Sequence, residues 1–260
     1  MRTLSTHWMK ISFLVLGGML VLFIVWPLLQ TVLSSNPAIL WNTLLDKEVL
    51  SSIAITFYSS LIATGIAFLT GVPLAYLLAR STFPGKRLIE GIIDLPIVVP
   101  HSAVGIALLM LFGRQGVLGR AFAPLGIKFV SAVPGIVIAM LFVSMSFLVN
   151  AARDGFASVD PRLEKVARTL GASQWKALWH VSFPLAWRSI LSGMILMWAR
   201  GLSEFGAVII LSYHPTVAPV LLYTRFESYG LDYARPLATI LILSCLVVFV
   251  GLRMVAGRRR

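Results

Sequence analysis

The sequence is poor in the side chains that carry covalent or metal chemistry. Cys245 is the one cysteine among 260 residues and lies inside an apolar run, so neither a disulfide framework nor a thiol site is expected. The histidines are scattered without the spacing of metal ligands, so structural or interfacial positions are expected for them. Paired carboxylates and a Ser/His/Asp set are also missing, which disfavours a membrane-embedded enzyme. The four histidines are His7, His101, His180 and His214.

A glycine-rich phosphate-binding loop is missing as well. The pair Gly85-Lys86 lacks both the upstream glycine and the following Ser or Thr of a P-loop. We therefore expect that the chain does not hydrolyse ATP by itself, and we assign it no catalytic residue, no metal and no cofactor of its own.

Charged residues are few. Asp, Glu, Lys and Arg make up 12% of the chain, whereas hydrophobic residues make up 58%. A soluble domain of this size does not need so much apolar surface, so an integral membrane protein is expected. The net charge of +12 could suggest a nucleic-acid partner, but the basic residues stand between apolar runs, as they do in membrane proteins. Membrane lipid is the expected surrounding, and nucleic acid is excluded.

Long apolar runs are what the sequence has in abundance. A run of about 20 apolar residues crosses the ~30 Å core of a bilayer as one helix. The first run is retained as a span, because it is too long for a signal peptide and no clear cleavage site follows it. We therefore expect an all-α membrane protein with a single transmembrane domain over residues 1–260. Its six spans are expected at about 11–33, 53–78, 92–112, 133–149, 190–211 and 236–255.

Lys and Arg set the expected orientation. With six spans, both termini lie on one side of the membrane, together with the loop 80–87 and the polar stretch 154–188. This side carries more Lys and Arg than the other, including the arginines at 258–260. By the positive-inside rule it is cytoplasmic. The polar stretch is therefore accessible to a cytoplasmic partner.

Two spans contain residues that alter helix packing. Ala63, Ala67 and Gly71 form a small-residue stripe at four-residue spacing, which suits close helix contact in lipid. In the third span, Pro96 and Pro100 break regular hydrogen bonding. Freed backbone groups in lipid survive only against protein or a water-filled cavity. A plain kink and a helix that lines a pathway are equally open interpretations of this span.

The polar stretch has helical order of its own. Asp160 is a good N-cap and Pro161 a good first residue of a helix, and Gly171 can supply the left-handed residue that ends it. Ser173 can cap a second helix, which Pro184 is expected to stop. Two short amphipathic helices joined at a glycine are therefore expected. The apolar side of the first, at spacings i, i+3, i+4 and i+7, consists of Leu163, Val166, Ala167 and Leu170.

This stretch resembles the EAA loop of ABC importer permeases. That loop has a Glu-Ala-Ala motif followed by a glycine and, at a fixed distance from the glycine, a proline. In this sequence Pro184 follows Gly171 by thirteen residues. The position of the motif's glutamate, six before the glycine, holds Lys165, with Glu164 beside it. The resemblance implies a loop that couples the spans to a cytoplasmic ATPase. The simpler alternative is an interfacial helix that only ties two spans together. The implied coupling residues are Leu163, Glu164, Val166, Ala167, Leu170, Gly171 and Ala172.

Two charges lie inside the expected fifth span. Arg200 and Glu204 are four residues apart, so they can pair on one helix face. Charges inside a span are costly and usually face the interior of the bundle. Arg200 is about ten residues from either end of its run, which disfavours a snorkelling arginine near a helix end. An interior or interface role is therefore expected for the pair.

The run around these charges, Ala-Arg-Gly-Leu-Ser-Glu-Phe-Gly-Ala at 199–207, resembles that of oxyanion importers, the molybdate/tungstate and sulfate permeases. The stretches 94–100 and 168–172 resemble the same subfamily, and the likeness to the molybdate/tungstate permeases is greatest. It implies a type I ABC importer permease fold and a homodimer in the cytoplasmic membrane of a prokaryote. The implied partners are two cytoplasmic ABC ATPase subunits, which hold ATP and magnesium, and an extracytoplasmic oxyanion-binding protein.

We therefore expect a transport subunit that moves molybdate or tungstate by alternating access and is not itself an enzyme. One alternative is a sulfate/thiosulfate permease, which pairs two different membrane chains. An ion-conducting channel, which would have no ATPase partner, is the alternative from another class. The candidate residues of the pathway and its gate are Pro96, Pro100, Arg200, Ser203, Glu204, Phe205 and Gly206.

Overall fold

The protein is helical throughout the part of the chain that the structure describes. The computed structural model describes residues 2–257, without the side chains of 2–7, 252, 253 and 255–257. The arginines at 258–260, which entered the predicted orientation, lie outside the described residues. The elements are α1 (Arg2–Leu33), α2 (Pro37–Leu45), α3 (Lys47–Arg80), α4 (Lys86–Val98), α5 (His101–Phe112), α6 (Val117–Phe122), the 3-10 turn η1 (Ala123–Leu125), α7 (Val133–Ser158), α8 (Pro161–Thr169), α9 (Gln174–Ala177), the π-helical turn η2 (Leu178–Ser182), α10 (Phe183–Leu202), α11 (Gly206–Leu211), α12 (Ala218–Tyr229) and α13 (Leu231–Gly257).

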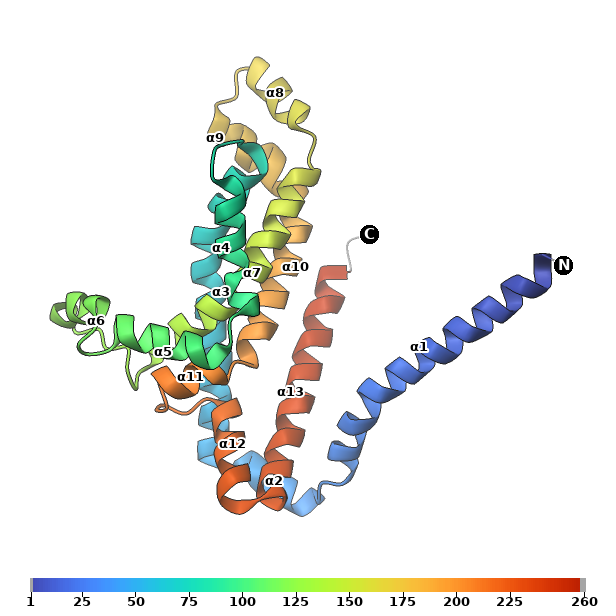
Figure 1. Ribbon diagram of the computed structural model, residues 1–260, viewed down its shortest axis with the longest axis vertical. Coiled ribbons are helices and arrows are strands. Elements are labelled where there is room, and N and C mark those ends of the chain that lie inside the picture. The colour runs from blue at the N-terminus through green and yellow to red at the C-terminus, as the bar shows by residue number, and fades with distance from the viewer. Residues whose placement is uncertain (1, 258–260) are drawn as a thin grey trace.

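Three long helices, α3, α7 and α10, lie side by side at the centre of the protein (Figure 1). Small residues allow α3 and α7 to approach closely: a Cβ added at Gly71 would lie only 2.9 Å from Cγ2 of Val149. Ala63 and Ala67, from the same stripe, are buried. The predicted small-residue contact is therefore confirmed, and Phe156 of α7 is fully buried in the core beside it.

Within residues 2–257, five helical segments are long and apolar enough to cross a membrane, and a sixth predicted span is broken. The broken span consists of α4 and α5, which meet at an angle of 112°. Val99 between them has an extended backbone, with ψ of 134°, because the residue before a proline avoids the helical region. Pro100 then begins the new direction. The predicted third span, 92–112, therefore contains two helices, and the break lies at the prolines that were expected to interrupt its regular hydrogen bonding.

The predicted fifth span, 190–211, is not one helix either. The helix α10 ends at Leu202, residues 203–205 are not helical, and α11 follows as a separate short helix. The segment contains Gly201 and Gly206 and a buried carboxylate at Glu204. Because the run 190–211 is mostly apolar, the sequence was interpreted as one span without this interruption.

Other boundaries also differ from the prediction. The helix α7 runs on to Ser158 and α13 begins at Leu231, while α2, α6 and α12 were not predicted. The polar stretch 154–188 therefore contributes its first residues to α7 and its last residues to α10. The loop proper is 159–173, with α8 inside it.

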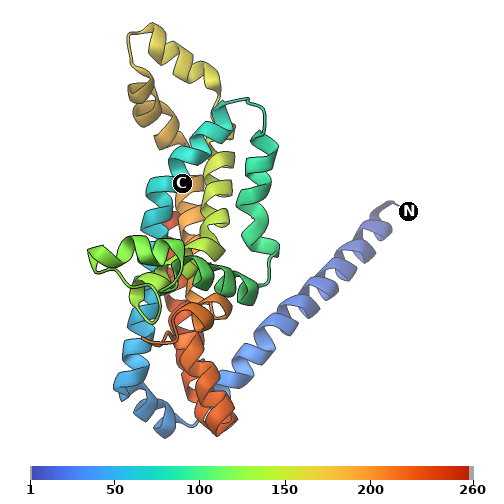
Figure 2. The same cartoon turned by 60° about the vertical axis from the view of Figure 1, so that its left-hand side comes forward.

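The first helix, α1, projects from the rest of the protein as an arm (Figures 1 and 2). The most apolar window of its stretch Trp8–Leu33 is 0% buried. The arm is attached near its end, where Ser35 Oγ and Thr239 Oγ1 of α13 are 2.7 Å apart and Thr239 Oγ1 also donates to Thr31 O at 3.3 Å. A long apolar surface of α1 is therefore left exposed by the described part of this chain.

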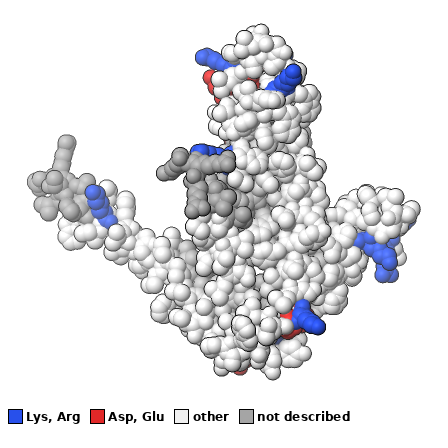
Figure 3. Space-filling view, turned by 180° about the vertical axis from the view of Figure 1, so that it is seen from behind, with Lys and Arg blue, Asp and Glu red and all other residues white. Residues whose placement is uncertain are grey.

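Charged side chains mark the two ends of the long axis. Figure 3 shows them around α8, at the opposite end and on the projecting segment around α6, with a mostly uncharged surface between. At the end opposite α8, Arg225 contacts Asp46 at 2.6 Å and Glu48 at 3.1 Å. The 34 residues of α3 extend about 51 Å at 1.5 Å per residue. Since a bilayer core is ~30 Å thick, α3 is long enough to extend beyond it.

Candidate functional site

The loop 159–173 has the helix signals that its sequence predicted. Asp160 Oδ1 accepts the N–H of Arg162 at 2.8 Å, and Pro161 is the first residue of α8. Gly171 has φ of +91°, the left-handed conformation expected at the end of this helix. Ser173 Oγ accepts the N–H of Lys176 at 3.3 Å and so caps the next helix. The prediction of two helices joined at a glycine is confirmed.

Pro184 does not stop the second helix, so this prediction was wrong. Helical structure is continuous over Gln174–Leu202, because the π-helical turn η2 precedes the proline. In an α-helix the proline ring would clash with the carbonyl of the residue four before it, here His180. A π-turn widens the backbone at this place. The helix that begins in the loop therefore continues directly into the membrane-spanning part of α10.

The apolar stripe of α8 is exposed. Leu163, Val166 and Leu170 are 46%, 56% and 83% exposed, and Ala167 and Ala172 are partly buried. A Cβ added at Gly171 would meet no atom within 4 Å, so only its backbone conformation demands glycine. An exposed apolar face on a polar loop is typical of a surface that a partner covers.

Glu164 points away from this stripe and toward the membrane helices. Its Oε1 accepts from Arg80 Nε at 2.8 Å and from Ser182 Oγ, and its Oε2 accepts from Tyr76 OH at 2.9 Å. Burial alone would raise the pKa of Glu164, but the hydrogen bonds from Ser182, Arg80 and Tyr76 outweigh it, so the pKa lies below its ordinary value. The implied coupling set is therefore divided between an outward apolar face and one inward carboxylate.

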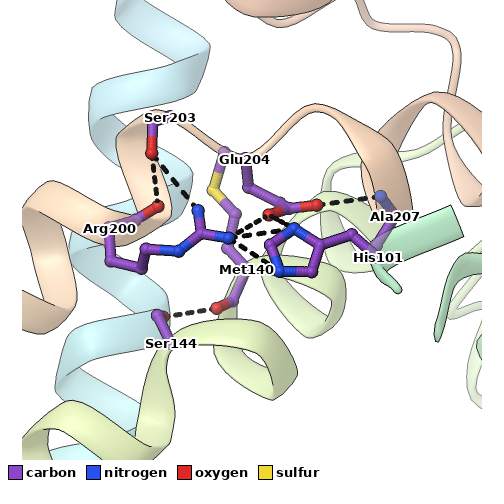
Figure 4. A network of polar contacts seen from close by, with 7 residues as sticks. All are labelled: His101, Met140, Ser144, Arg200, Ser203, Glu204 and Ala207. Atoms are coloured by element: carbon purple, nitrogen blue, oxygen red, sulfur yellow. Dashed lines mark hydrogen bonds and ion pairs between the residues drawn. The ribbon is translucent and has the colours of Figure 1, made fainter. Parts of the chain in front are cut away.

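A second polar cluster joins the two broken spans (Figure 4). Arg200 is in the last turn of α10, and Glu204 lies in the break that follows. The expectation that Arg200 is far from a helix end was therefore wrong. The expected pair does form, with Arg200 Nη2 at 3.2 Å from Glu204 Oε2. The other oxygen, Oε1, accepts the N–H of Ala207 at 2.8 Å and so satisfies a free donor at the start of α11. Glu204 is 1% exposed.

His101, the first residue of α5, completes this cluster and was missed from the sequence. Its Nδ1 lies 2.9 Å from Glu204 Oε2, and Arg200 Nη2 lies 2.9 Å from each ring nitrogen (Figure 4). A Cβ added at Gly206 would lie 2.9 Å from His101 Cβ, and one at Gly105 would lie 3.0 Å from the backbone of α11. The two broken spans therefore pack closely, with a carboxylate, a guanidinium and a histidine ring at their junction.

The remaining predicted gate residues lie around this cluster to different degrees. Ser203 is exposed and accepts from Arg200 Nη1 at 3.2 Å. The rings of Phe205 and Tyr223 are in tilted contact, with 5.0 Å between their centroids, and both line a groove of about 750 Å³ that α1, α12 and α13 also border. Pro100 directly precedes His101, whereas Pro96 is buried in α4, about one turn earlier. The sequence thus identified the segment that forms the junction but not its partner histidine.

The fold is that of an importer permease. A bacterial ABC transporter that imports the acidic polysaccharide alginate superimposes on this chain with a TM-score of 0.73, at 18% sequence identity, over 98% of this chain and 99% of that one. At this identity the likeness shows the fold alone. It confirms the expectation of an all-α permease fold of the ABC importer kind.

Sequence relationship then gives the family. Residues 71–260 match the family described as the inner membrane component of binding-protein-dependent transport systems. The molybdate/tungstate transport system permease protein of Thermococcus kodakarensis is 44% identical over 95% of this chain and 96% of its own length. A probable sulfate transport system permease protein of Chlorokybus atmophyticus is 33% identical over 83% of this chain and 77% of its own. The chain therefore belongs to this family of multi-pass membrane permease subunits.

Proposed function

We propose that this chain is the membrane subunit of an ATP-driven importer of molybdate and tungstate. The observation that carries the substrate class is the 44% identity, over nearly the full length of both chains, with a permease whose name specifies these oxyanions. The sulfate permease relative is more distant, at 33% identity over 83% of this chain. Sulfate or thiosulfate therefore remains the alternative substrate of the same transport mechanism.

Coupling to ATP hydrolysis is proposed at α8. The exposed stripe Leu163, Val166 and Leu170 offers apolar area to a cytoplasmic partner, and the chain has no phosphate-binding loop of its own. An ATPase subunit that holds ATP and magnesium would cover this stripe, with Gly171 and Ala172 at its edge. Closure of two such subunits on ATP would displace the loops and rock the spans as rigid bodies.

A homodimer is proposed as the membrane part. The exposed arm α1 supports this proposal, because it projects away from the rest of its own chain. Lipid alone could cover an apolar helix, but a helix that packs on a second copy would project in this way. In this arrangement, both termini and α8 face the cytoplasm in a prokaryotic cytoplasmic membrane. Selectivity would come from an extracytoplasmic oxyanion-binding protein.

The gate is proposed at the junction of the broken spans. His101, Arg200 and Glu204 hold α5, α10 and α11 together, so a change in this contact would open or close the path between copies. We do not assign anion binding to Arg200, because Glu204 beside it would repel a dianion. Holding the helices of the gate is the role that fits the charges.

Ligand-stimulated ATP hydrolysis tests this function. The chain would be reconstituted in lipid with its ATPase and binding protein, and hydrolysis measured with molybdate, tungstate or sulfate. Stimulation by molybdate and tungstate, and not by sulfate, is expected. Stimulation by sulfate alone would keep the mechanism and overturn the substrate, whereas a chain that forms no complex with an ATPase would favour the channel alternative.

A further inference from the structure

The carboxylate of Glu164 lies where three elements meet. It belongs to α8, its Oε2 accepts from Tyr76 of α3, and its Oε1 accepts from Arg80 of α3 and from Ser182 of η2. The side chains of Glu164 and Arg80 are only 14% and 12% exposed. Arg80 Nη2 also donates to the carbonyl of Val159 at 3.0 Å, so the same guanidinium holds the chain on both sides of the turn into α8.

These contacts make a firm attachment rather than a sliding surface. Hydrogen bonds to an ionised carboxylate are about twice as strong as those between neutral groups. A largely buried charge is also costly to leave without partners. Displacement of α8 relative to α3 would separate the carboxylate from donors on both α3 and η2. The lower-energy response to a force on α8 is therefore a movement of the attached helices with it.

The attached helices lead from the loop to the broken-span cluster. The turn η2 continues into α10, and the last turn of α10 contains Arg200. The helices α3 and α10 are also joined near the end of α10, where Ser60 Oγ donates to the carbonyl of Trp198 at 2.8 Å. Ser60 packs against Gly201, because a Cβ at this position would collide with the Ser60 hydroxyl. One rigid path thus connects Glu164 to the residues that hold α5 and α11.

We propose that Glu164 is a positioning residue that clamps α8 to the cytoplasmic ends of α3 and α10, and that it does not contact the ATPase. The clamp makes α3 and α10 follow the loop, while the outward apolar stripe makes the contact with the partner. This inference rests on the proposed function of the loop as the segment that couples transport to ATP hydrolysis.

The test compares transport with ATP hydrolysis in the same proteoliposomes, which contain the full complex of this chain, its ATPase and the binding protein. Glu164→Gln is expected to leave the complex assembled but to lower the molybdate taken up per ATP hydrolysed by about fivefold or more, the range of ordinary coupling free energies. Arg80→Met should give the same loss, and the double variant should add little to either. Asp154→Asn is the matched control, since Asp154 is an exposed carboxylate bound to its neighbour Arg153.

Tyr76→Phe is a milder variant that keeps the test informative if Glu164→Gln or Arg80→Met fails to fold. It removes one hydroxyl from the clamp, and a smaller loss of uptake per ATP is expected with normal assembly. Two results would overturn the clamp: loss of the ATPase from the Glu164→Gln complex while the Arg80→Met complex stays intact, or unchanged uptake per ATP in Glu164→Gln and Tyr76→Phe. Failure of the proposed function is a different result, because the wild-type complex itself would then show no oxyanion-dependent hydrolysis.

Discussion

Glu204 Oε2 lies 2.9 Å from Nδ1 of His101, which connects the bend of one broken span to the break in another. The same carboxylate accepts from Arg200 and from the backbone of Ala207. One buried acid therefore satisfies a cation at the end of α10, a histidine at the start of α5 and the first turn of α11. The helices around this carboxylate approach closely at Gly105 and Gly206, where an added Cβ would lie 3.0 Å and 2.9 Å from the neighbouring helix.

Glu204→Ala should destabilise the protein. It leaves Arg200 without its acid and removes the acceptor for the N–H of Ala207, for a loss of about 2 kcal/mol in the free energy of unfolding, since Arg200 is partly exposed. Thermal unfolding of the purified chain in detergent measures it. Glu227→Gln, at an exposed glutamate of α12, is the control and should leave the transition unchanged. Equal transitions for Glu204→Ala and wild type would show that the cluster does not hold the spans together.

Gly171→Val should uncouple hydrolysis from transport. A β-branched residue at φ of +91° costs roughly 1–2 kcal/mol of backbone strain, so the end of α8 would shift while the space around it stays open. Gly171→Asn is the matched control, because asparagine tolerates the left-handed region better. Uptake of molybdate and ATP hydrolysis are measured together. Normal uptake by the valine variant would contradict the role of this turn in coupling.

Leu170→Asp should weaken the contact with the ATPase. Leu170 is 83% exposed, and loss of its burial at an interface corresponds to about tenfold or more in the dissociation constant. Leu170→Met keeps the apolar contact and should bind normally. The measurement is the amount of ATPase that remains bound to the purified membrane chain as the complex is diluted. Equal retention by the aspartate and methionine variants would place the contact elsewhere.

The attachment of α8 should depend on pH. Burial raises the pKa of Glu164, but the hydrogen bonds from Ser182, Arg80 and Tyr76 lower it further, to below its ordinary value of 4.5. A lowered folded-state pKa means that the carboxylate stabilises the fold fully above about pH 4.5 and loses this effect as the pH falls through the folded-state pKa. The unfolding temperature of wild type should exceed that of Glu164→Gln at pH 7, and the difference should shrink in acid. A difference independent of pH would mean that the ionised carboxylate is not what stabilises the attachment.

The local parts of the candidate site were predictable because local chemistry determines them. The cap at Asp160 and the left-handed Gly171 depend on neighbours a few residues away, and the structure has both. Pro184 was misinterpreted because a π-turn, which no sequence pattern here indicates, accommodates it. The prolines before α5 predicted an interruption, but the 112° bend depends on what the two halves pack against.

The parts that depend on tertiary contact were not predictable. Arg200 and Glu204 were expected to pair within one helix, whereas they pair across a helix end. His101 reaches them from α5, and a single sequence contains no signal that joins positions so far apart. The inward direction of Glu164 likewise depends on Tyr76 and Arg80 of a different helix.

Accumulation of molybdate inside sealed proteoliposomes tests the central claim most directly. The vesicles would contain this chain with its ATPase and binding protein, and elemental analysis would count the metal taken up. The account predicts uptake against a gradient that needs hydrolysable ATP, occurs also with tungstate and fails with sulfate. Movement of ions down their gradient, at the same rate with or without the ATPase and ATP, would contradict it and identify a channel.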